Sequence, residues 1–265
     1  MDLQQLPVKF IANAAESDAV WDTFLPPEIH TILSQSGESG LLAARSKKEL
    51  YLALCNKPLL IDDGKLSFSL DEWSGRKCYM ISARELGIVW GEDPQYWTWT
   101  SHPESRFQEV AELLHVGWLE IHGKLDTRLL SPSTLYKAYL VVKFTRNAFG
   151  FKHLPGEVSV GLEGGEHTKQ TLFLHIEGEI NPYYEREMGY SKERGDAEGE
   201  TVREVVINDN RYQRESPEWL EIELGEFFCD GGEDGLLKMR YVAKGSLYWK
   251  SGLIVQGIEV RPKRQ

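Results

Sequence analysis

The chain has 265 residues, of which 41% are hydrophobic and 27% are charged, a balance that is typical of a folded protein and excludes global disorder. Acidic residues outnumber basic ones by 41 to 30, so the formal net charge of -11 disfavours general binding to nucleic-acid phosphates. No apolar run approaches the roughly 20 residues that cross a bilayer, and residues 1–10 show no secretory signal. We therefore expect no contact with nucleic acid or membrane.

The cysteine and histidine patterns argue against catalytic and metal chemistry. Three cysteines, Cys55, Cys78 and Cys229, lie far apart, which predicts free thiols and a reducing compartment. The chain has no GxSxG elbow, no HExxH helix and no phosphate-binding glycine loop, and its histidines fit no common metal-ligand spacing. We therefore expect no enzyme, no catalytic residue, no metal and no cofactor.

The first quarter of the chain has the period of a helix. Apolar side chains recur at intervals of three and four in residues 18–24, with Ser17 as the predicted N-cap, and two prolines end this helix. Residues 27–33 repeat the spacing. Ser46 and Glu49 have the capping-box spacing, which predicts another short helix, although a solvated charged turn is the alternative interpretation.

From about Arg76 the apolar period changes from helical to two. Seven stretches alternate apolar and polar side chains between turns rich in glycine or proline: 119–122, 136–144, 157–163, 172–177, 220–224, 237–241 and 253–260. Many short alternating strands without long helices predict an antiparallel β-sandwich or barrel. Residues 185–204 interrupt this rhythm with glutamate, arginine and glycine, so we expect a solvated loop there.

Residues 90–99 form the most unusual segment, because four aromatic side chains surround an Asp-Pro turn. Sugar rings stack their C–H faces on aromatic rings, and their hydroxyls form hydrogen bonds with carboxylate and amide side chains. The candidate sugar-binding residues are therefore Trp90, Trp97, Tyr96, Glu92, Asp93 and Gln95. The alternative interpretation is that these rings close the core, and we expect at least two of them to do so.

Five separated segments resemble one known family. They are Ile81–Leu86, Trp90–Trp99, Glu109–Leu113 with Gly117–Gly123, Trp219–Phe228 and Trp249–Pro262. In this order they look like the phloem protein 2 lectins of plants, the Nictaba-like group. The resemblance implies a jelly-roll-like, all-β lectin domain in the cytoplasm and nucleus that binds N-acetylglucosamine oligomers or the cores of N-glycans.

The resemblance also bears on single residues. Trp90 and Trp97 match aromatic positions that are associated with sugar binding in this family. Leu236 and Ala243 stand where a member of the family has glutamates. The implied partners are glycans or glycoproteins, and a homodimer stays open.

The N-terminal region carries a second resemblance. Residues 10–26, 46–51 and 58–64 are similar to the F-box and connector of the plant F-box lectins, which present substrates to Skp–cullin ubiquitin ligases. The opening of the motif is missing, so we expect a truncated F-box remnant at 1–33, a connector with a short helix at 34–75 and the lectin domain at 76–263. A lectin is the leading hypothesis. A substrate receptor that docks on a Skp adaptor is the alternative, and an interaction domain without sugar affinity is a third.

Overall fold

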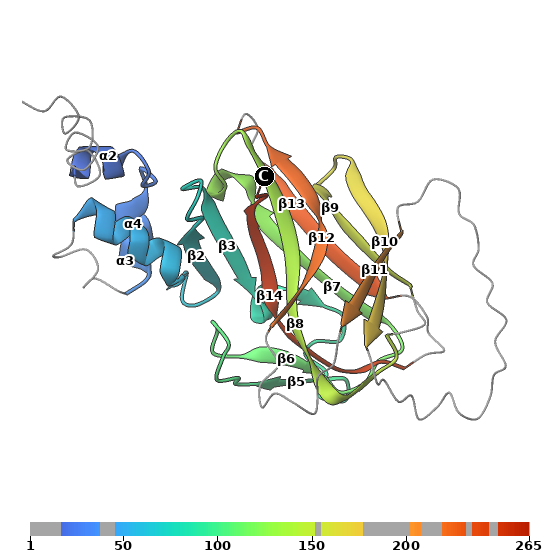
Figure 1. The fold of residues 1–265 in the computed structure, drawn as a ribbon. Helices are drawn as coiled ribbons and strands as arrows, with labels where there is room; N and C mark the ends of the chain where they lie inside the picture. The colour runs from blue at the N-terminus through green and yellow to red at the C-terminus, as the bar shows by residue number, and fades with distance from the viewer. Residues whose placement is uncertain are drawn as a thin grey trace, which may run out of the picture.

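The structure is a computed structural model that describes residues 17–37, 46–151, 155–176, 202–207, 219–231, 235–243 and 249–264. Two β-sheets pack face to face, and short helices lie beside the edge of one sheet (Figure 1). The first part of the predicted F-box remnant and most of the predicted loop at 185–204 lie outside the described residues. The predicted mainly β sandwich with a helical N-terminal region is confirmed.

The described helices are α2 (Asp18–Asp22), α3 (Ile29–Gln35) and α4 (Lys47–Asn56). The short helix predicted after Ser46 is confirmed, and Ser46 is its N-cap, because the Ser46 hydroxyl accepts the Glu49 amide hydrogen bond at 3.3 Å. Helix α3 begins two residues later than predicted, since the Ile29 amide still closes a turn onto the Pro26 carbonyl. The apolar faces of α3 and α4 join the core through Ile29, Ile32, Leu33, Leu50, Tyr51 and Leu54.

The larger sheet has eight strands. They are β1 (Leu59–Ile61), β2 (Leu66–Leu70), β3 (Lys77–Ser82), β5 (Trp97–Thr100), β6 (Val110–Leu113), β8 (Thr134–Phe149), β12 (Leu220–Cys229) and β14 (Ser251–Pro262). Strand β14 lies at the centre of this sheet, paired with β3 and β6 along one edge and with β8 along the other.

The smaller sheet has six strands in the order β11, β10, β9, β13, β7 and β4. Their bounds are Val202–Ile207, His167–Ile176, Pro155–Leu162, Leu236–Ala243, Leu119–Asp126 and Gly87–Ile88. All seven alternating stretches of the sequence coincide with strands; residue 163 follows β9, and residue 177 lies outside the described residues. In β7, for example, Leu119 and Ile121 are buried between the sheets while Lys124 faces outward, as expected of a sheet with one solvated face.

Two features differ from the sequence-based expectation. Strand β1 pairs with β2, and β2 pairs with β3, so the sheet begins at Leu59, inside the segment expected to be a connector. Phe68 and Leu70 are buried, and this burial makes the hairpin part of the sandwich. Strands β10 and β11 pair in parallel, whereas the prediction was antiparallel throughout.

None of the described helices is long and apolar enough to cross a membrane.

Candidate functional site

The aromatic segment folds into a compact turn between β4 and β5, held by Asp93. The Asp93 carboxylate accepts the Gln95 amide hydrogen bond at 2.9 Å, and its carbonyl accepts the amides of Tyr96 and Trp97, both at 3.0 Å. Asp93 was expected to reach a sugar hydroxyl. The structure instead gives its carboxylate a hydrogen bond within the turn.

Two indoles stabilise this turn through hydrogen bonds to its backbone carbonyls. Trp97 is 2% exposed, and its Nε1 donates to the Val89 carbonyl at 3.2 Å. Trp99 is half-buried, its Nε1 donates to the Gly91 carbonyl at 3.0 Å, and the Arg84 guanidinium lies 3.7 Å from its ring centroid. The expectation that Trp97 stacks on a ligand is therefore corrected, because its ring is enclosed in the core and cannot present a face to solvent.

Trp90 lies between the two anchored carbonyls and points outward. Its side chain is 47% exposed, and its backbone φ is 57°. A bulky residue in the left-handed region is strained, and such strain persists only where the surroundings enforce it. Here the indole hydrogen bonds to residues 89 and 91 hold the backbone on either side of Trp90. The fold therefore presents this ring at a cost in backbone strain.

Trp90 is the first member of an aromatic row formed by Trp90, Tyr96, His115 and Trp249. Ring centroids are 5.3 Å apart from Trp90 to Tyr96, 6.2 Å from Tyr96 to His115 and 5.4 Å from His115 to Trp249. Tyr96 is half-buried, and the other three side chains are exposed. The row therefore brings exposed aromatic surface together from three segments that are distant in the sequence.

A buried lysine joins the last two of these segments. Lys250 is fully buried and exchanges two backbone hydrogen bonds with Val116, at 2.8 and 2.9 Å. Its Nζ donates to the Gly117 carbonyl at 2.9 Å. Burial lowers the pKa of Lys250 to about 8, because a charged ammonium loses hydration in the core. These contacts place His115 beside Trp249.

Polar side chains on the same turn flank Trp90. Gln95 is exposed. The Glu92 side chain is 84% exposed, and its carboxylate lies 3.7 Å from Arg84. Arg84 also donates to the Glu109 carboxylate at 2.8 Å, which lowers the pKa of Glu109. Glu92 and Gln95 are therefore exposed polar side chains on the turn that carries Trp90.

The two positions where a relative has glutamates lie apart from each other. Ala243 is buried and pairs with Leu119, whereas Leu236 pairs with Asp126 at the opposite end of β13. Seven residues of strand separate them by about 23 Å. Neither side chain can hydrogen-bond a hydroxyl, so any polar contacts of the aromatic row must come from other residues.

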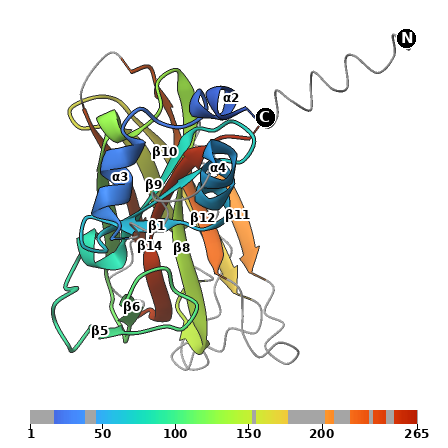
Figure 2. The same ribbon diagram turned by 90° about the vertical axis from the view of Figure 1, so that its left-hand side faces the viewer.

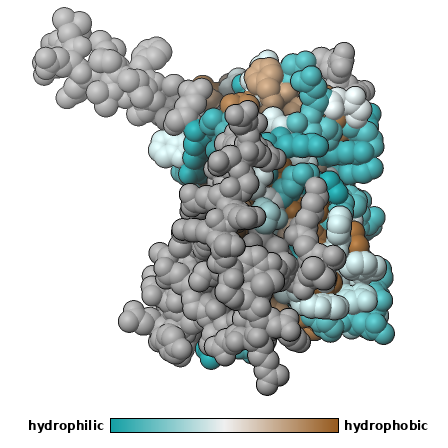
Figure 3. Space-filling view, turned by 90° about the vertical axis from the view of Figure 1, so that its right-hand side faces the viewer, coloured by the Kyte–Doolittle hydropathy of each residue, from teal (hydrophilic) through white to brown (hydrophobic). Residues whose placement is uncertain are grey.

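A second groove crosses the outer face of the smaller sheet, with a volume of about 430 Å³. Two of its cations are paired: Arg240 with Glu120 at 2.8 Å and Lys238 with Glu163 at 2.6 Å. From the side of β10 and β11, the described surface is mainly hydrophilic (Figure 3). Across the described ranges, no group of three or more His, Cys, Asp or Glu could hold a metal ion. The aromatic row is thus the stronger candidate.

Sequence reasoning missed two members of the row. His115 fits no metal-ligand spacing, and Trp249 lies far along the chain from the aromatic turn. No local pattern links them, because the Lys250 contacts that bring them together are tertiary. Tyr96 and Trp90 belong to the predicted set and do lie together, with ring planes inclined by 39°.

Comparison with known proteins agrees with the sequence resemblance. The phloem protein 2 family model matches residues 76–262. An F-box protein from Arabidopsis thaliana is 45% identical over 260 residues, which cover 97% of this chain and 72% of that protein. The putative F-box protein PP2-B8 of the same plant is 40% identical, with 96% of this chain and 78% of that protein covered.

A solved structure with some similarity is a β-(1,4)-mannanase of Podospora anserina with a GH26-CBM35 architecture. The similarity has a TM-score of 0.34 and 8% identity and covers 71% of this chain and 28% of that one, values too low to support an argument about function. The chain belongs to the phloem protein 2 family.

Proposed function

We propose that the protein is a carbohydrate-binding lectin that takes N-acetylglucosamine oligomers or N-glycan cores on the aromatic row. The observation that carries this proposal is the succession of Trp90, Tyr96, His115 and Trp249 with exposed or half-exposed rings. A β-linked oligosaccharide repeats an apolar ring face along its length, which suits a row of aromatic rings. Exposed Glu92 and Gln95 supply hydrogen-bond partners for hydroxyl and acetamide groups.

Calorimetric titration with chitotriose tests this proposal. Trp90→Ala and Trp249→Ala should each weaken binding by about tenfold or more, because a stacked aromatic is a typical hot spot. Trp73→Ala is the matched control, since Trp73 is also exposed but lies on the turn between β2 and β3, outside the row. Chitotriose binding that survives both row variants, or that is undetectable in the parent, would refute the aromatic row as a sugar site.

A second proposed function is that of a substrate receptor in a Skp–cullin–F-box ubiquitin ligase. It rests on the relatives named F-box proteins, whose similarity extends over 97% of this chain. The burial of α3 argues against a large adaptor-binding surface on the described helices. Ile29, Ile32 and Leu33 of α3 are buried in the core of this chain, so they are not available to an adaptor. A standard interface needs roughly 800 Å² from each partner.

Surface plasmon resonance with a plant Skp adaptor tests the second proposal. We expect binding weaker than about 10 μM, because Val20 and Phe24 are the only exposed large hydrophobic side chains among residues 17–37. Phe24→Asp should abolish the residual binding, since Phe24 is 47% exposed. Tight, stoichiometric binding through residues 1–33 would show that the F-box remnant forms a working adaptor surface.

The lectin proposal also covers the cell compartment and the fate of the bound glycan. We propose that the protein works in the cytoplasm and nucleus, where free thiols such as Cys55 and Cys78 stay reduced. We also propose that it binds its glycan without transforming it. Incubation of chitotriose with the protein, followed by chromatography, should return the trisaccharide intact, and imaging of a fluorescent fusion should show both compartments.

A further inference from the structure

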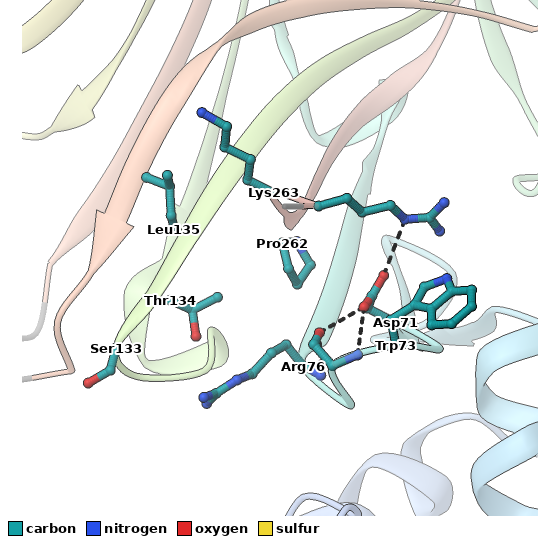
Figure 4. A pocket seen from close by; sticks show the side chains of 10 residues that line it. Asp71, Trp73, Arg76, Ser133, Thr134, Leu135, Pro262 and Lys263 are labelled. Atoms are coloured by element: carbon teal, nitrogen blue, oxygen red, sulfur yellow. Dashed lines mark hydrogen bonds and ion pairs between the residues drawn. The ribbon is translucent and has the colours of Figure 1, made fainter.

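A pocket of about 840 Å³ lies at the other end of the molecule from the aromatic row. It is enclosed by the turn between β2 and β3, the start of β8 and the residues that follow β14 (Figure 4). The described chain ends beside it, opposite β5 and β6 (Figures 1 and 2). No residue of the aromatic row contributes to this pocket.

The pocket has an apolar strip. Trp73 is 81% exposed, the largest exposure of any large hydrophobic side chain in the described ranges. Leu135 is 37% exposed, and the buried Pro262 lies between the two in the close-up view (Figure 4). A tryptophan ring that remains in water contributes no burial free energy to folding. Tryptophan and arginine are, however, the residues that most often dominate protein–protein interfaces.

The pocket is also cationic. Its lining carries three cations, Arg76, Lys263 and Arg264, against one carboxylate, Asp71. Lys263 is paired with Glu226 at 2.8 Å, and Arg264 lies 3.7 Å from Asp71.

Arg76 differs from these two cations. It gives one N–H to the Pro132 carbonyl at 3.2 Å, and within the described residues no carboxylate lies at ion-pair distance from it. Its remaining donors form a planar fork that matches a carboxylate. Ser133, which follows Pro132 on the rim, has a φ of 50°, a strained value of the kind that clusters at binding sites.

We propose that this pocket is a docking site for an acidic, extended segment of a partner protein. A carboxylate of the segment pairs with Arg76, and a neighbouring apolar side chain lies on Trp73. Charge complementarity supports this choice of partner. The chain as a whole carries a net charge of -11 and repels acidic proteins, so a local cationic surface selects where and how such a partner can approach.

Fluorescence anisotropy with a labelled hexapeptide of alternating leucine and aspartate tests the proposal. The matched peptide replaces each aspartate with asparagine. We expect saturable binding of the aspartate peptide, weakened when salt rises from about 0.05 M to about 0.5 M, because the Debye length falls over this range. Trp73→Ala and Arg76→Gln should each weaken binding by about tenfold.

Arg128→Gln is the matched control, because Arg128 is an exposed arginine that pairs with Asp126 outside the pocket. It should leave peptide binding unchanged. All three variants should also keep the parent's chitotriose binding, so loss of the peptide site and loss of the sugar site are distinguishable. Equal binding of the asparagine peptide, no saturation up to about 1 mM, or unchanged binding in Trp73→Ala and Arg76→Gln would overturn the proposal.

Discussion

Trp90 and Trp97 belong to one turn and have opposite environments. Trp97 is enclosed and hydrogen-bonded to Val89, whereas Trp90 is 47% exposed in a strained backbone conformation. Trp97→Ala should lower the free energy of unfolding by about 3–5 kcal/mol, because it leaves a large cavity. Trp90→Gly should leave it unchanged or raise it by about 1 kcal/mol through release of backbone strain. Urea denaturation measures both, and equal losses in the two variants would contradict these assignments.

Lys250 makes stability depend on pH in a defined window. Burial lowers its pKa from 10.5 to about 8, so between these values the unfolded chain binds more protons than the folded one. The contribution of Lys250 to the free energy of unfolding therefore rises with pH across this window and is constant below it. The Lys250→Met variant lacks this rise in the free energy of unfolding with pH. The free energy of unfolding of this variant, relative to that of the parent, should fall between pH 7 and pH 10, as followed by urea denaturation. A difference that does not change with pH would refute the lowered pKa of Lys250.

Among the elements, β14 has a glycine where the sheet leaves no room for a side chain. A Cβ on Gly257 would lie 2.0 Å from the Ile81 carbonyl oxygen of β3, next to the register shift between Val255 and Gly257. Gly257→Ala should therefore lower the free energy of unfolding by more than about 2 kcal/mol, as measured by thermal denaturation. Gly165→Ala is the matched control, because its Cβ would meet Leu162 at an ordinary 3.5 Å. Equal melting temperatures would contradict the close approach.

Local sequence patterns predicted some of these strands and helices and missed others. Strict alternation identified the long strands, and the Ser46 capping box identified the start of α4, because both are local patterns. The β1–β2 hairpin was missed although 66–70 alternates, since its neighbours read as helix and loop. The parallel pairing of β10 with β11 leaves no local signal. For the site, no local sequence pattern predicted that Trp90 is exposed and Trp97 is buried, and the packing separates their roles.

Across the whole molecule, the aromatic row and the cationic pocket lie at opposite ends of β14. Trp249 precedes the first residue of this strand, and Lys263 follows its last residue. Twelve extended residues span about 36 Å, which is several Debye lengths at physiological salt. The two sites should therefore bind independently. The dissociation constant for chitotriose should change less than about twofold when the acidic peptide is saturating, as measured by calorimetry, and a larger change would reveal coupling through the sheet.

The central place of β14 also has a consequence for biosynthesis. This strand is the last one in chain order, yet β3, β6 and β8 all pair with it. A ribosome adds about 5–20 residues per second, so these three strands leave the exit tunnel well before their partner exists. Until Pro262 emerges, the nascent larger sheet has unpaired edges of the kind that chaperones bind and that aggregate. The sandwich therefore closes only after β14 has been synthesised, and a nascent chain that ends before this strand cannot reach the native state.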